Sequence, residues 1–235
     1  MKSKYIAWAI APIFLIGCSD YLETPPSVDY GENEVFATRA DAEKLLTTLY
    51  AEGMPYGFCM SSSNTDRRLL SSSTLASACD EGEDVATWAM GNAAWNAGNH
   101  TNTNFPWDED CRFYLRNHTM RVANLILKRI HEVPFDEGDP DFNKRTTGEA
   151  YFMRAMLLWE GVYRYGGMPI VREVIDPTDF SQRSRSSFAD CIDSILVDCD
   201  RATRYLPDYY TDNTKLGRVT RIAALALKAR VLLYA

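Results

Sequence analysis

Apolar side chains recur three or four positions apart in five segments of the chain, the spacing that places them on one face of an α-helix. In the first segment, Ala42, Leu45, Leu46, Leu49 and Tyr50 follow this spacing. Glycine or proline ends the first four segments, because neither residue continues a helix readily. The pattern predicts a mainly α protein, with helices over about 39–53, 108–133, 147–165, 187–206 and 220–235.

Short polar side chains mark the expected helix starts. Pairs with capping-box spacing are Thr38 with Asp41, Thr146 with Glu149, and Ser187 with Asp190. The expected helix over 147–165 is apolar on several sides, so we expect neighbouring helices to cover more than one of its faces. Arg154 and Arg230 interrupt apolar helix faces, and we expect them to pair with buried carboxylates such as Glu149 or Glu160, or to cover aromatic rings.

The helices are expected to pair in the manner of tetratricopeptide repeats. The 33 residues from Ser187 to Thr220 come close to the 34-residue period of that repeat. The last expected helix is rich in alanine, which allows close helix approach, and it reaches Ala235 with no stop signal. We expect the natural reading frame to continue or this product to be truncated. A missing neighbour on that side would leave Leu232 and Leu233 exposed.

Two stretches lack helical periodicity. Residues 18–37 are polar and turn-rich, which predicts an extended tether. Residues 54–106 carry two serine runs and many Gly and Asn residues, so we expect a long irregular insertion on the surface of the domain formed by 38–235.

The N-terminus has the layout of a secretory signal. Lys2 and Lys4 precede thirteen uncharged residues, 5–17, and then Cys18. The small Gly17 before the cysteine fits a bacterial lipoprotein cleavage site, which predicts removal of 1–17 and fatty acylation of Cys18. An ordinary signal peptide with an incidental cysteine, or a buried helix, is the alternative. The run is too short to span a bilayer, which takes about 20 apolar residues.

Charge narrows the function further. Formal net charge is −7, and without Lys2 and Lys4 the chain carries 23 basic against 32 acidic residues, or −9. This balance argues against nucleic acid as a partner and against electrostatic adhesion to anionic lipid, so the acyl chains provide the membrane attachment. Five further cysteines, an odd number, show no metal or redox spacing and are expected to be small buried residues.

The insertion offers the best candidates for ligand binding, because sugars bind to flat aromatic faces and to amide groups. The principal cluster is Trp95 with Asn92, Asn96, Asn99 and Asn102, and the secondary candidates are Trp88, Arg67 and Arg68. Alternatively, Trp95 and Trp107 pin the insertion onto the helices. No motif for a nucleophile, zinc or phosphate is present, and Asp139-x-Asp141-x-Asn143 lacks the glycine and glutamate of a calcium loop. We expect neither catalysis nor a cofactor.

Several segments resemble the SusD/RagB family of Bacteroidetes outer-membrane lipoproteins. They are Cys18 to Pro25, Gly148-Glu149-Ala150-Tyr151-Phe152-Met153-Arg154-Ala155, Tyr165-Gly166-Gly167-Met168-Pro169, Arg185-Ser186-Ser187, Leu206-Pro207, and Gly217-Arg218-Val219-Thr220 with 223–234. Their order and spacing, rather than any one segment, carry the resemblance across about 18–235.

The resemblance implies a helical fold of tetratricopeptide-like pairs whose loops bind a glycan or a peptide. It implies a palmitate-type lipid anchor, placement at the cell surface, and delivery of nutrient to a SusC-like TonB-dependent transporter. Family members are about twice as long, so the chain looks like an N-terminal portion. Two other functions stay open, namely a helical-repeat adaptor that binds only protein and an accessory enzyme that degrades surface glycans.

Overall fold

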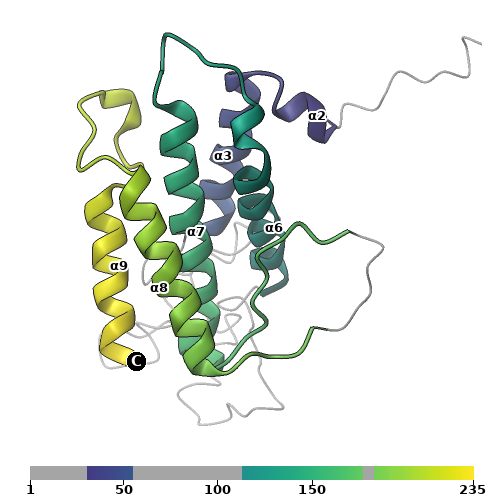
Figure 1. The fold of residues 1–235 in the computed structure, drawn as a ribbon, viewed down its shortest axis with the longest axis vertical. Helices are drawn as coiled ribbons and strands as arrows, with labels where there is room; N and C mark the ends of the chain where they lie inside the picture. The colour runs from purple at the N-terminus through teal and green to yellow at the C-terminus, as the bar shows by residue number, and fades with distance from the viewer. Residues whose placement is uncertain (1–30, 55–112, 177–182) are drawn as a thin grey trace, which may run out of the picture.

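The computed structural model describes residues 31–54, 113–176 and 183–235, which form a bundle of α-helices (Figure 1). The α-helices are α2 (Glu32–Val35), α3 (Arg39–Gly53), α6 (Phe113–Arg129), α7 (Phe142–Tyr165), α8 (Phe188–Tyr205) and α9 (Arg221–Tyr234). Two 3-10 turns, η4 (Ile130–Glu132) and η5 (Asn213–Lys215), lie in the connections. The mainly α prediction is confirmed.

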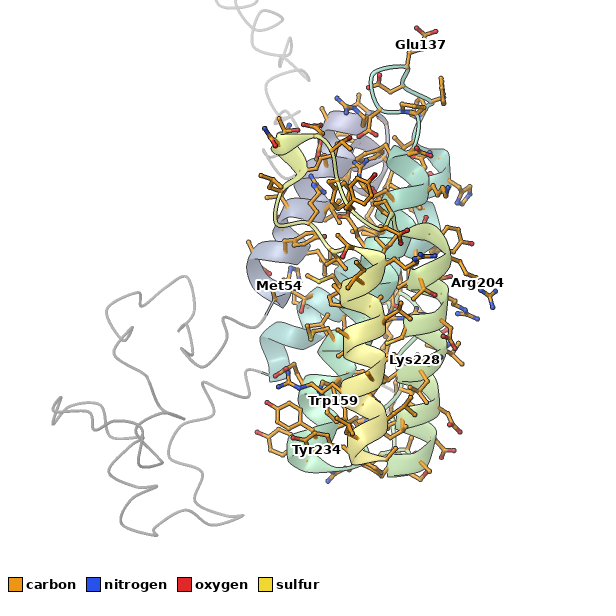
Figure 2. The ribbon with its side chains drawn as sticks, turned by 90° about the vertical axis from the view of Figure 1, so that its left-hand side faces the viewer. Met54, Glu137, Trp159, Arg204, Lys228 and Tyr234 are labelled. Atoms are coloured by element: carbon orange, nitrogen blue, oxygen red, sulfur yellow. The ribbon has the colours of Figure 1, made fainter. Side chains whose placement is uncertain are left out.

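Helix α7 lies in the middle of the bundle. It packs against α8, α6, α3 and, less extensively, α9, so the prediction that its several apolar faces are covered is confirmed. Successive helices run antiparallel, and α8 and α9 form a hairpin (Figure 1). Figure 2 shows Glu137 at one end of the bundle and Trp159 and Tyr234 at the other. We call these the network end and the aromatic end.

Three predicted helix starts are confirmed. The side chains of Thr38, Ser187 and Thr220 each accept a hydrogen bond from the backbone N–H three residues later. Each of these caps depends on residues close together in the chain, which is why the pattern identified them.

The predicted capping box of Thr146 and Glu149 is wrong. Helix α7 begins at Phe142, so both residues lie inside the helix, where Thr146 and Glu149 are fully buried. Burial against neighbouring elements, rather than a local cap, explains the polar side chains at these two positions.

The expected tether is also shorter than predicted. Residues 32–35 form the short helix α2, and Phe36 is buried in the core with the guanidinium of Arg129 over its ring. Burial of this aromatic ring fixes the chain just before α3, so the last residues of the predicted 18–37 tether belong to the bundle.

Glycines allow the closest contacts in the bundle. Gly166 ends α7 with a φ of 74°, in the left-handed region that side chains other than hydrogen disfavour. At Gly148 a Cβ atom would lie 2.8 Å from Leu206 Cγ and 2.9 Å from Tyr205 Cβ. Helix α7 therefore touches the end of α8 with its backbone.

Two further expectations concern apolar side chains. Cys191 and Cys199 are buried and unoxidised, as predicted, whereas the other cysteines lie outside the described residues. Leu232 and Leu233 are exposed, with 52% and 84% of their surface accessible. Within the described ranges, no helix combines the length and the apolar character needed to cross a membrane.

Candidate functional site

The residues that the sequence singles out for ligand binding all lie outside the described residues. They are Arg67, Arg68, Trp88, Asn92, Trp95, Asn96, Asn99 and Asn102, and Cys18 and Trp107 lie outside as well. The ligand cluster and the lipidation site therefore stay predictions, and the described helices show what supports them.

The chain enters and leaves the predicted insertion between α3 and α6, which pack side by side. Gly53, the last residue of α3, is buried against α7, where a Cβ atom would lie 3.4 Å from Met153 Cε and 3.7 Å from Leu157 Cδ2. Leu157 precedes Trp159 by two residues, so α3 ends beside the aromatic end of the bundle.

Aromatic rings gather at this end. Trp159 is buried, and its ring centre lies 5.4 Å from that of Tyr163 and 5.3 Å from that of Tyr234 (Figure 2). Tyr163 and Tyr234 are 38% and 62% exposed, and the Tyr163 hydroxyl donates to Glu160 Oε2 at 3.4 Å. Exposed rings beside a carboxylate are the groups that bind the apolar faces and hydroxyls of sugars.

A first buried ion pair joins three helices. Arg154 of α7 donates through Nε and Nη2 to both carboxylate oxygens of Asp198 of α8, at 2.7 and 2.8 Å. Its Nη1 donates to Asn124 Oδ1 of α6 at 2.9 Å. The Asn124 amide donates in turn to the backbone carbonyls of Val171 and Glu173, both at 3.1 Å. The pair therefore holds the extended segment after α7 against the bundle.

The predicted partners of the two arginines are thus partly wrong. Arg154 binds Asp198 instead of Glu149 or Glu160, because α8 packs directly over this face of α7. Its guanidinium does lie 5.4 Å from the ring centre of Tyr151, as the aromatic alternative predicts. Arg230 lies on the exposed surface of α9.

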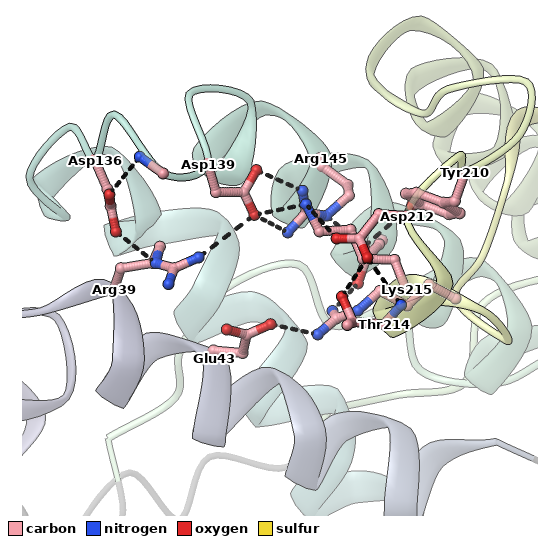
Figure 3. Close-up of polar contacts among 12 residues, drawn as sticks. Arg39, Glu43, Asp136, Asp139, Arg145, Tyr210, Asp212, Thr214 and Lys215 are labelled. Carbon is pink, nitrogen blue, oxygen red and sulfur yellow. Dashed lines mark hydrogen bonds and ion pairs between the residues drawn. The ribbon is translucent and has the colours of Figure 1, made fainter.

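A second ion network lies at the opposite end of the bundle (Figure 3). Asp139 accepts hydrogen bonds from Nη1 and Nη2 of Arg145, both at 2.9 Å, and Lys215 Nζ lies 3.0 Å from its Oδ2. Arg39 Nε pairs with Asp136 at 2.7 Å. The network thereby joins α3, the turn before α7 and the turn at η5.

Glu149 extends this network into the core. Its carboxylate lies 3.3 Å from Arg145 Nε and 3.1 Å from Arg218 Nη1, and the Tyr210 hydroxyl approaches it at 3.4 Å. Arg218 also pairs through Nη2 with Glu43 of α3 at 2.6 Å. One arginine from the loop before α9 therefore connects α3 with α7.

Burial and pairing change the pKa values of these acids in opposite directions. Burial alone raises the pKa of Asp139, but the hydrogen bonds from Arg145 and Lys215 outweigh it and hold the pKa at about 2. Burial raises the pKa of Glu149, and Arg218 and Arg145 offset only part of that rise. Burial also raises the pKa of the Cys199 thiol to about 12, which keeps it a protonated, unreactive thiol.

Both clusters pair their carboxylates with cations inside the protein and so fix loops against helices. Asp139, which begins the calcium-like sequence, is engaged by Arg145 and Lys215. Across residues 31–54, 113–176 and 183–235, no three His, Cys, Asp or Glu side chains are grouped so as to hold a metal ion. We interpret the two clusters as supports for the loops at each end of the bundle.

Comparison with known proteins identifies the family. The sequence model of a SusD-like family, described as starch-binding and associating with the outer membrane, matches residues 20–233. The chain belongs to the SusD-like family. Curated proteins include no significant match to the chain.

Solved SusD-like structures share the fold of this chain. A SusD-like protein from Bacteroides fragilis is 29% identical with a TM-score of 0.64, and the match covers 86% of this chain and 36% of that one. A laminarin-binding SusD-like protein is 21% identical with a TM-score of 0.66 and coverages of 85% and 41%. A SusD-like carbohydrate-binding protein from Bacteroides fragilis is 19% identical with a TM-score of 0.62 and coverages of 84% and 37%.

This SusD-like chain therefore spans about two fifths of the length of the solved relatives that it matches. Sequence reasoning missed the partners in both ion networks and the aromatic cluster around Trp159. Asp198 lies 44 residues from Arg154, and Glu43 lies 175 residues from Arg218. Only the apolar surroundings of Arg154 and Glu149 in their helix signalled that each has a buried partner.

Proposed function

We propose that this chain is a non-enzymatic lipoprotein that binds oligosaccharide at the outer membrane and passes it to a SusC-like TonB-dependent transporter. The observation that carries the proposal is the match of residues 20–233 to a family described as starch-binding and associating with the outer membrane. Acyl chains on Cys18 provide the attachment, and the protein works in the water next to the membrane.

The described helices support this proposal through their rigidity. Ion networks at both ends of α7 hold the loops to the bundle, so a ligand surface built on it pays little ordering entropy when it binds. The ligand surface combines Trp95 and the nearby asparagines of the insertion with the exposed rings of Tyr163 and Tyr234. One solved protein of this fold is named for binding laminarin, so laminarin and starch are the first ligands to test.

Glycan binding is tested by calorimetric titration of the purified chain with laminarin and with soluble starch. We expect binding to one of them, and we expect Trp95→Ala to weaken it at least tenfold, since a stacked aromatic ring contributes about 1–3 kcal/mol. Trp107→Ala is the matched control and is expected to retain affinity. Unchanged affinity in Trp95→Ala would remove this residue from the site.

The non-enzymatic part of the proposal has its own measurement. Incubation with labelled polysaccharide is expected to release no shorter fragments, and detergent extraction from the native host is expected to co-purify a TonB-dependent transporter. Release of fragments by the purified chain would show an enzyme. Co-purification without retention on any glycan would favour the helical-repeat adaptor.

A further inference from the structure

Helix α9 carries a second apolar face that points away from α8. Four large side chains on it are exposed, with accessible fractions of 64% for Ile222, 50% for Leu225, 52% for Leu232 and 84% for Leu233. Ala226 and Ala229, also exposed, lie between them. We call the six residues the α9 stripe. Contiguous exposed apolar side chains of this kind mark an interaction surface.

The α9 stripe has the shape of a helix-packing surface. Its positions recur at spacings of three, four and seven, so they share one side of the helix, opposite Ala224, Leu227 and Val231, which are buried. Large side chains stand at both ends and the two alanines in the middle, which lets a second helix approach closely at the centre. The stripe runs the length of the 14-residue helix, about 20 Å.

Charge selects the kind of helix that fits. Helix α9 contains Arg221, Lys228 and Arg230 and no acidic residue. On its covered side, Lys228 pairs with Asp200 of α8 at 2.5 Å, and Arg221 pairs with Asp208 just beyond α8 at 2.5 Å. Arg230 lies exposed on the other flank of the stripe. A second copy of α9 would bring like charges together, whereas a helix with acidic flanks would complement them.

The solved relatives indicate where such a helix comes from. They share this bundle, yet more than half of their own length lies outside the matched region. We propose that the α9 stripe binds an amphipathic helix with acidic residues beside its apolar face, supplied by the additional polypeptide of a SusD-like protein. The helix lies on α9 as α8 does on the opposite side, and α9 becomes an interior helix like α7. This docking is independent of the proposed glycan binding.

The test uses the purified chain and a synthetic fluorescent peptide with the α8 sequence, 188–205, in which serine replaces both cysteines. We expect its anisotropy to rise with added chain. Replacing both Leu225 and Leu233 with Asp is expected to weaken binding at least tenfold. Val197→Asp, at an exposed position of α8 away from the stripe, is the matched control and is expected to bind as the parent does. Circular dichroism checks that each variant is folded.

A charge exchange gives a second readout that does not depend on the apolar variants. A peptide with lysine in place of its aspartates is expected to bind the parent chain more weakly, and Arg230→Glu is expected to reverse that preference. Absence of binding, or equal binding by the double variant and the parent, would overturn the proposal. A dimer in sedimentation that the double variant abolishes would assign the stripe to a second copy and would also overturn it.

Discussion

At the scale of single residues, stability depends on buried charges that have partners on other elements. Arg154 and Asp198 are both nearly inaccessible, at 6% and 3% of their side-chain surfaces, and each satisfies the other in a two-bond arrangement. Taking both charges out of water costs several kcal/mol, which the pair recovers only while both members are present. Loss of one member leaves the other charged and buried.

Replacement of Arg154 by Met is therefore expected to lower the free energy of unfolding by about 3–5 kcal/mol. Urea denaturation measures this loss, and the double change of Arg154 to Met and Asp198 to Leu is expected to restore most of it. Arg201→Met is the matched control, since Arg201 lies 3.8 Å from the same carboxylate but is 42% exposed. Its expected cost is at most about 1 kcal/mol. A double variant as unstable as the single one would contradict this account.

Acid stability depends on Asp139. Its pKa is lowered to about 2, so its contribution is complete above the unfolded-state pKa near 4 and is lost as the pH falls through 2. We expect Asp139→Asn to lose about 2 kcal/mol at neutral pH and to flatten the acid limb of the stability curve between pH 4 and pH 2.

Glu149→Gln is the matched control for that measurement. Burial raises the pKa of Glu149, so its contribution is greatest below the unfolded-state pKa and is lost as the pH rises through the folded-state value. The acid limb is therefore expected to persist in Glu149→Gln. Thermal unfolding followed across the pH range distinguishes the two variants, and an unchanged limb in Asp139→Asn would contradict the assignment.

At the scale of helices, local and tertiary causes separate cleanly. Thr38, Ser187 and Thr220 cap helices through neighbours three residues away, so their helix starts could be predicted from the sequence. Thr146 has the same local pattern but lies buried within α7, and its Oγ1 has no hydrogen-bond partner. Nothing within a few residues reveals the elements that bury it, which is why the start of α7 was predicted wrongly.

Substitutions at two threonines test this distinction. Thr220→Ala removes a cap and is expected to cost about 1 kcal/mol. Thr146→Val keeps the shape of the side chain and removes a buried hydroxyl without a partner, so it is expected to stabilise the protein by about 1 kcal/mol. Denaturant titration of both variants gives the comparison, and a destabilised Thr146→Val would show that the hydroxyl is engaged after all.

Two glycines of α7 make a matched pair for helix packing. Gly148→Ala places a Cβ atom 2.8–2.9 Å from atoms close to the backbone of Leu206 and Tyr205, and we expect a loss of about 1–3 kcal/mol from the displaced α8. Gly161→Ala meets the flexible end of Met168 at 3.3 Å, so the gain in helix propensity, up to about 1 kcal/mol, is expected to offset the contact. Equal effects on the thermal midpoint would contradict the packing described at Gly148.

At the scale of the whole molecule, the bundle and its ligand surface differ in how far the sequence defines them. Helical spacing predicted the helices because each repeats a local pattern, and α7 was predicted to be covered on several faces. The ligand cluster around Trp95 depends on how an irregular insertion folds back on the bundle, which spacing does not encode. The exposed rings of Tyr163 and Tyr234 emerged only with the structure, because α7 and α9 meet at Trp159.

Membrane attachment is the last property of the whole molecule to be tested, and it depends on one sulfur atom. Acylation of Cys18 with more than one chain holds a protein stably in a bilayer, whereas the acidic remainder has no electrostatic attraction to anionic lipid. In cells fed labelled palmitate, the parent chain is expected to carry label and to sediment with membranes. Cys18→Ser is expected to lose both properties, and Cys59→Ser, the control, to keep them. Label that persists in Cys18→Ser would place the fatty acid elsewhere and remove the anchor from this position.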